Sequence, residues 1–187
     1  MPDVARSNSI ENKSVRWRQA PLREAYLRDP SFALITYQAQ SSSACVPATE
    51  PLTTAVLCGQ HSSHYIAASV HRAFGGECNL PSPEELFATS IAAGLDTAIR
   101  MTASAMSIEL TWLNVKVEIQ VDARGALQME PGVPVAFQSI DIDVLVSAAT
   151  KTQRDQLALL IRKAEHCCAI LQTLCSPPQV VITRIKT

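Results

Sequence analysis

The sequence has few aromatic residues, few glycines and no long apolar segment. Aromatic residues make up 5% of the 187 positions and glycines number six, whereas hydrophobic residues reach 47%. The core is therefore expected to be aliphatic, and a low-complexity chain is excluded. No stretch approaches the length that spans a bilayer, and the polar start has no apolar run like that of a secretory signal. These absences predict a soluble, cytoplasmic protein.

A strong charge of either sign is missing as well. The formal net charge is -1, with both signs interspersed along the chain. Such a balance gives no electrostatic reason to expect nucleic acid or an anionic membrane as a partner. The length suits one domain, which we place at residues 31–187, preceded by an arm and short helix at residues 1–30. No cofactor is expected.

Hydrophobic patterns predict consecutive antiparallel strands before the first long helix. Alternating apolar residues indicate strands, whereas repeats every three or four residues indicate helices. A long turn region is expected at residues 122–134. The predicted strands lie at 32–40, 51–59, 63–74, 115–121, 137–146 and 179–185, and the predicted helices at 20–30, 83–106 and 152–174.

The start of the helix at 83–106 is the clearest local signal. Ser82 is a suitable N-cap, Pro83 suits the first helical position, and Glu85 completes a capping box. Apolar residues recur every four positions, from Phe87 to Ile99, so the helix should be largely buried. Gly94 lies in its middle, where glycine costs about 1 kcal/mol relative to alanine. A close helix crossing or the loss of a functional side chain would each explain this glycine.

Two motifs resemble the OsmC and organic hydroperoxide resistance family. The segment Pro83–Leu86 resembles the Pro-Glu-Glu-Leu motif that opens the family's first helix. The segment Cys168–Leu174, "CAILQTL", resembles its Cys-Pro-Val-Ser-x-Thr-Leu motif. Together with the order of the elements, these motifs extend the resemblance from about residue 31 to the end of the chain.

The resemblance implies an α+β fold, with curved antiparallel sheets wrapped around buried helices in an intertwined homodimer and two equivalent sites at the dimer interface. In active members, a peroxidatic cysteine in the first helix reduces hydroperoxides, a resolving cysteine in the second helix forms a disulfide with it, and a dithiol restores both. The implied partners are therefore a second copy of the chain, a hydroperoxide or other small hydrophobic ligand, and a dithiol reductant.

Counting from Pro83, the family's peroxidatic cysteine falls on Gly94. The resolving position corresponds to Cys168 and the acidic position to Glu84, whereas Ala169 replaces the motif's proline. Without that proline, the second helix is expected to continue smoothly past Cys168. Our first hypothesis is an OsmC-like protein without ordinary peroxidase activity, with a small cavity beside Gly94 that accepts a ligand.

An alternative hypothesis makes the protein a thiol-dependent hydroperoxide reductase with a rearranged pair of cysteines. Cys78 lies in the loop before the first long helix, and it would act as the nucleophile opposite Cys168. The simpler interpretations are a free loop thiol at Cys78 and a buried core thiol at Cys168. Arg72 and Arg100 are candidates for a positive group at the site.

The remaining cysteine and histidine residues predict no metal site and no disulfide. Cys167 and Cys168 are adjacent, and Cys175 lies about two helical turns, or roughly 10 Å, beyond Cys168. His166 and an upstream group match no zinc-binding spacing; that group is His61, His64, His71 and Cys78. A third hypothesis, a structural role in which residues 1–30 recruit a partner protein, is also open.

Overall fold

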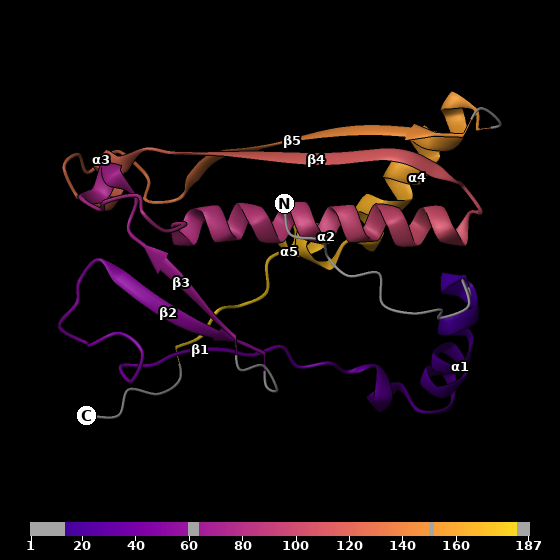
Figure 1. Ribbon diagram of the computed structural model, residues 1–187, viewed down its shortest axis with the longest axis horizontal. Helices are drawn as coiled ribbons and strands as arrows, with labels where there is room; N and C mark the ends of the chain where they lie inside the picture. Colours follow the sequence, from indigo (N-terminus) through magenta and orange to yellow (C-terminus); the bar gives the residue numbers. More distant parts are fainter. Residues whose placement is uncertain (1–13, 60–63, 150–151, 183–187) are drawn as a thin grey trace.

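The computed structural model describes residues 14–59, 64–149 and 152–182. It contains two antiparallel sheets and one long helix, α2, that lies beneath the longer sheet (Figure 1). The helices are α1 (Val15–Arg28), α2 (Pro83–Ala105), α3 (Ala123–Ala126), α4 (Arg154–Cys167) and α5 (Ala169–Cys175), with short 3-10 helices η1 (Pro30–Ala33) and η2 (Arg72–Phe74). The strands are β1 (Ala39–Ser41), β2 (Thr53–Cys58), β3 (Tyr65–Ser69), β4 (Leu110–Val121) and β5 (Phe137–Ala148).

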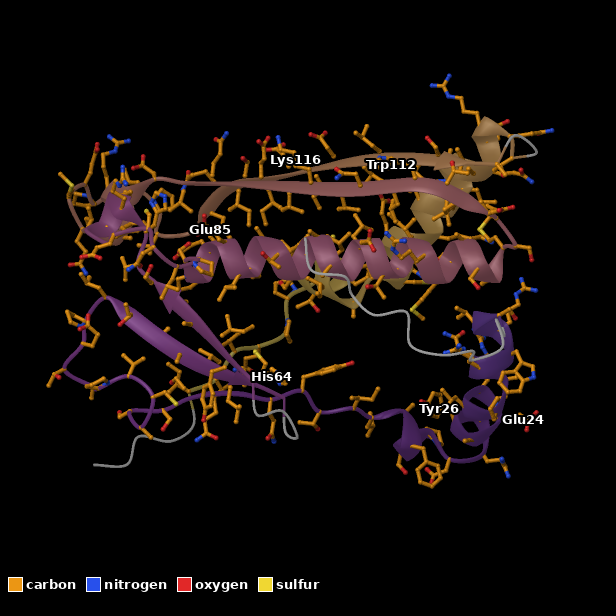
Figure 2. The ribbon with its side chains drawn as sticks, in the orientation of Figure 1. Glu24, Tyr26, His64, Glu85, Trp112 and Lys116 are labelled. Carbon is orange, nitrogen blue, oxygen red and sulfur yellow. The ribbon has the colours of Figure 1, made fainter. Side chains whose placement is uncertain are left out.

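Both sheets are antiparallel and join strands that are neighbours in the sequence. The smaller sheet has the order β1-β2-β3, with Ala39 opposite Cys58 and Thr53 opposite Ser69. The larger sheet pairs β4 with β5, with Val115 opposite Val144. Valine and isoleucine alternate with polar residues along β4, so one face is apolar. Figure 2 shows Trp112 and Lys116 on the face of β4 that points away from α2.

The main core lies where α2 passes between the larger sheet and α4. Ile99 of α2 and Leu160 of α4 are completely buried, and Leu113, Val115, Ile142 and Val144 pack against them from the sheet. The cluster contains no aromatic side chain, as the composition predicted. Its buried members are Leu95, Ile99, Ala103, Leu160, Ala164 and Cys168.

The structure confirms the predicted start of α2. The Ser82 hydroxyl accepts a hydrogen bond from the backbone N–H of Glu85 at 3.2 Å, and the Glu85 carboxylate accepts one from the N–H of Ser82 at 2.7 Å. The helix then runs to Ala105, close to the expected end. The antiparallel meander at the start is confirmed, but two of its strands are shorter than predicted: 32–40 contributes only the start of β1 and overlaps η1, and 63–74 ends in η2.

Several expected details were wrong. The second helix does not continue past Cys168 but breaks there into α4 and α5. It begins at Arg154 rather than at 152, and the Gln156 side chain accepts a hydrogen bond from the N–H of Gln153 at 3.0 Å. The long turn contains the short helix α3. Residues 179–182 form no strand, while the rest of that predicted strand, 183–185, lies outside the described residues.

The N-terminal helix α1 is longer than expected, since it begins at Val15 instead of Ala20. Its N-terminal end lies against α2, where the N–H of Val15 donates a hydrogen bond to the Ser104 hydroxyl at 3.3 Å. The expected arm at residues 1–13 lies outside the described part of the chain. Within the described ranges, no helix has the length and apolar character that crossing a membrane requires.

Candidate functional site

Gly94 of α2 faces Cys168 at the junction of α4 and α5. A β-carbon at position 94 would lie 3.6 Å from the Cys168 sulfur. The sulfurs of a disulfide are about 2 Å apart, so a cysteine at 94 would form one with this thiol after a small shift of either side chain. Cys168 is only 3% exposed and belongs to the main core. Positions 94 and 168, which the resemblance makes the peroxidatic and resolving positions, therefore lie next to each other.

Ile170 occupies the space beside Gly94. Its Cδ1 atom would lie 2.8 Å from a β-carbon at position 94, closer than side chains pack. Ile170 replaces the valine of the family motif, and Cδ1 is the methyl group that valine does not have. The sequence shows isoleucine where the motif has valine, but the motif does not indicate that this side chain contacts position 94. A side chain at position 94 would therefore require Ile170 Cδ1 to shift.

The break in the helix sets the position of the Cys168 thiol. Cys168 has an extended backbone, with φ -82° and ψ 103°, and acts as the N-cap of α5. The side chain of Gln172 donates a hydrogen bond to the Glu165 carbonyl at 3.1 Å, which satisfies an acceptor near the break. The N–H of Gln172 also bonds to the Cys168 carbonyl at 2.9 Å. The bend therefore persists without the proline of the motif.

Glu84 lies at the N-terminal end of α2, away from Gly94 in its middle. It is half-buried and lines a cleft of about 370 Å³ with Glu85, His71 and the apolar face of β4. Figure 2 shows Glu85 at this end of the helix. Glu84 precedes Gly94 by ten residues, or roughly 15 Å along the helix axis, so one chain does not bring this carboxylate to Cys168.

Cys78 also lies near the start of α2. Its thiol is exposed and accepts a hydrogen bond from the backbone N–H of Arg72 at 3.1 Å, while its backbone has a positive φ of 54°. Cys78 shares a cleft with Glu85, which is nine residues, or roughly 13 Å, from Gly94 along the helix. Within one chain, Cys78 therefore lies beside the start of α2, whereas Cys168 lies beside its middle.

The two candidate arginines make their contacts away from Gly94. Arg100 forms an exposed ion pair with Asp96 at 2.6 Å, and this hydrogen bond raises the pKa of its guanidinium group. Arg72 belongs to η2, beside Cys78. Among the described residues, no three His, Cys, Asp or Glu side chains are arranged to hold a metal ion; His61 lies outside them. All six cysteines are free thiols.

Residues 76–183 match the OsmC-like protein family. This match covers more than half of the sequence, and it includes α2, β4, β5, α4 and α5. The chain belongs to the OsmC-like family. No curated protein sequence shows significant similarity to it.

Solved structures share this fold at low sequence identity. The organic hydroperoxide resistance protein OsmC of Legionella pneumophila is 20% identical, with a TM-score of 0.56 over 76% of this chain and 91% of that one. An organic hydroperoxide resistance protein of Elizabethkingia anophelis is 17% identical, with a TM-score of 0.55 over 77% and 91%. An OsmC-like protein of Mycoplasma pneumoniae is 12% identical, with a TM-score of 0.58 over 76% and 89%. The α+β fold is therefore that of the OsmC-like proteins.

Proposed function

We propose that this chain is a homodimeric, peroxide-stress-related OsmC-like protein that has lost ordinary peroxidase activity. The observation that carries the proposal is the pair Gly94 and Ile170. Position 94 offers no nucleophile, and a β-carbon there would meet the Cδ1 methyl group of Ile170 at 2.8 Å, so a cysteine would require this side chain to move. Two solved structures with this fold are named organic hydroperoxide resistance proteins, which supports the stress-related role.

The chemistry of a thiol peroxidase explains why these changes matter. A thiolate attacks the O–O bond, takes one oxygen as a sulfenic acid, and releases the alcohol; a second thiol then displaces water and forms a disulfide. Cys168 alone is a poor attacking group, because its sulfur is buried among Leu95, Ile99 and Leu160. Because the β-carbon position at Gly94 already meets Ile170 and Cys168, the small cavity expected there is closed in a single chain, and a small hydrophobic molecule would bind elsewhere along the subunit interface without being reduced.

Exposed apolar residues support the homodimer. Val180 is 89% exposed and Ile182 is 87% exposed in the isolated chain, although both are large and aliphatic. Leu34 and Tyr37, just before β1, are similarly exposed. Apolar surface of this extent is typical of a partner interface. A second copy of the chain would cover it.

The proposal is tested by following cumene hydroperoxide in the presence of the fully reduced protein and dihydrolipoamide. We expect the wild-type protein to consume no more peroxide than the dithiol alone. The variant Gly94→Cys/Ile170→Val restores the thiol and removes the obstructing methyl group, so peroxide should convert it to an intrachain disulfide with Cys168. Intact mass then decreases by two hydrogen atoms, whereas the control Gly94→Ala/Ile170→Val shows no such loss.

Turnover by the wild-type protein would overturn the proposal. If that turnover disappeared in both Cys78→Ser and Cys168→Ser, the rearranged thiol pair would be the active site, and the protein would be a thiol-dependent hydroperoxide reductase. Absence of the disulfide in Gly94→Cys/Ile170→Val would instead contradict the assignment of Gly94 as the position facing the resolving thiol.

A further inference from the structure

A second cleft lies between α1, the C-terminal half of α2 and the end of α4. Its volume is about 510 Å³, within the range of small-molecule sites. Figure 1 shows α1 below the C-terminal end of α2. Because α1 precedes residues 76–183, one wall of this cleft lies outside the segment that matches the family. The cleft reaches Ala98, one turn from Gly94 along α2, and Cys167, next to Cys168, but its lining includes neither Gly94 nor Cys168.

The rim of the cleft is positively charged. Two arginines come from α1 and three basic side chains come from α4, whereas no aspartate or glutamate lines the cleft. None of the five forms an ion pair within the described part of the chain; Arg23 only bonds to the neutral amide of Gln19 at 3.5 Å. These residues are Arg16, Arg23, Arg162, Lys163 and His166.

The acidic residue of α1 is directed elsewhere. Glu24 is the one carboxylate in this helix, and Figure 2 shows it at the part of α1 remote from α2. The first turn of α1, which approaches α2 through Val15, contains no acidic residue. The helix dipole adds a small positive potential at that end. An anion in the cleft would thus meet several cations without a competing carboxylate.

The floor of the cleft is apolar. It consists mainly of α2 side chains without charge, and Met101 is 41% exposed there. Methionine adapts readily to ligands of irregular shape. Val15 of α1 adds an aliphatic side chain. The α2 residues that line this floor are Ala98, Met101, Thr102, Ala105 and Met106.

We propose that this cleft binds a free anionic amphiphile, namely a carboxylate with a medium-length alkyl chain. The carboxylate would lie between Arg23 and Arg162, since guanidinium groups donate paired hydrogen bonds to carboxylates. The alkyl chain would cover Met101 and the adjacent alanines. A bare anion would leave the apolar floor exposed, whereas an uncharged alcohol would leave the cations unpaired.

The test uses calorimetric titration of the full chain with decanoate below its micellar concentration, with acetate and decan-1-ol as comparison ligands. We expect saturable decanoate binding, one molecule per chain, that weakens as salt is added. Arg23→Gln/Arg162→Gln should weaken this binding about tenfold. Arg28→Gln/Arg154→Gln is the matched control, because it removes the same charge from the same two helices outside the cleft, and it should bind as the wild type does.

A second pair of variants tests the floor. Met101→Gln should weaken decanoate binding, whereas Met129→Gln, at an exposed methionine outside the cleft, should not. Equal binding by the two arginine double variants would overturn the proposal, as would acetate binding as tightly as decanoate. Binding to phosphatidylglycerol vesicles without binding to monomeric decanoate would also overturn it, since the cleft would then recognise a membrane surface. Peroxide assays have no part in this test, so its outcome is independent of the proposed function.

Discussion

At the scale of single residues, the informative feature is a pair of neighbouring positions, 94 and 170, that both depart from what the family motifs lead us to expect. By the motif count, glycine stands at 94 where the resemblance expects a cysteine, and isoleucine stands at 170 where the motif has valine, one methyl group smaller. The sequence showed the first substitution through the count from Pro83. It did not show the contact between the two, because residues 94 and 170 are distant in the chain and meet only through the packing of α2 against α5.

This contact predicts coupling between positions 94 and 170. Gly94→Ala removes the glycine penalty of about 1 kcal/mol in a helix, but in the wild type the new β-carbon forces Ile170 Cδ1 to move. In an Ile170→Val background that atom is absent. We therefore expect Gly94→Ala to raise the free energy of unfolding of the Ile170→Val variant by at least about 0.5 kcal/mol more than it raises that of the wild type. Urea unfolding of the wild type, both single variants and the double variant, all at one protein concentration, measures this difference. Additive effects would show that Ile170 does not occupy this space.

At the scale of elements, the sequence predicted structure well where local chemistry decides it. The capping box at Ser82 and the alternating pattern of β4 depend on neighbours in the sequence, and both were confirmed. The break at Cys168 was not predicted, because the absence of proline favoured a continuous helix. The extended Cys168 and the bond from Gln172 to Glu165 produce the break instead. Its cause is packing and side-chain bonding rather than a backbone restriction.

The cap of α2 leads to a prediction at this scale. Ser82 is 2% exposed, so replacing its hydroxyl removes a hydrogen bond that water cannot easily replace. Ser82→Ala should lower the free energy of unfolding by about 1 kcal/mol. The control Ser90→Ala, at an exposed position of the same helix, should change it by less than about 0.5 kcal/mol. Urea denaturation at a fixed protein concentration compares the two, and equal losses would contradict a special role for the cap.

At the scale of the whole molecule, the sequence indicated the fold through the family motifs, and the similarity to solved structures confirms it. The candidate site was only partly predictable. Gly94 and Cys168 meet as the motifs implied, but Glu84 lies at the N-terminal end of α2, and Cys78 lies in the loop before that end of the same chain. A long helix separates its two ends by a fixed rise per residue. Only a second subunit can bring an end of one α2 to the middle of another, so the site as proposed depends on the dimer.

The last prediction concerns that dimer. Sedimentation of the wild-type protein should give a mass of twice the 20.2 kDa of one chain. Val180 and Ile182 are almost fully exposed in a single chain, so glutamates there cost little in an isolated subunit but would be buried at the interface. Val180→Glu/Ile182→Glu should therefore weaken dimerisation at least about tenfold. The control Met129→Glu/Val135→Glu places the same charges at other exposed apolar residues and should leave the dimer intact. A monomeric wild type would contradict the interface site, because Glu84 would then remain roughly 15 Å from Gly94 along one helix.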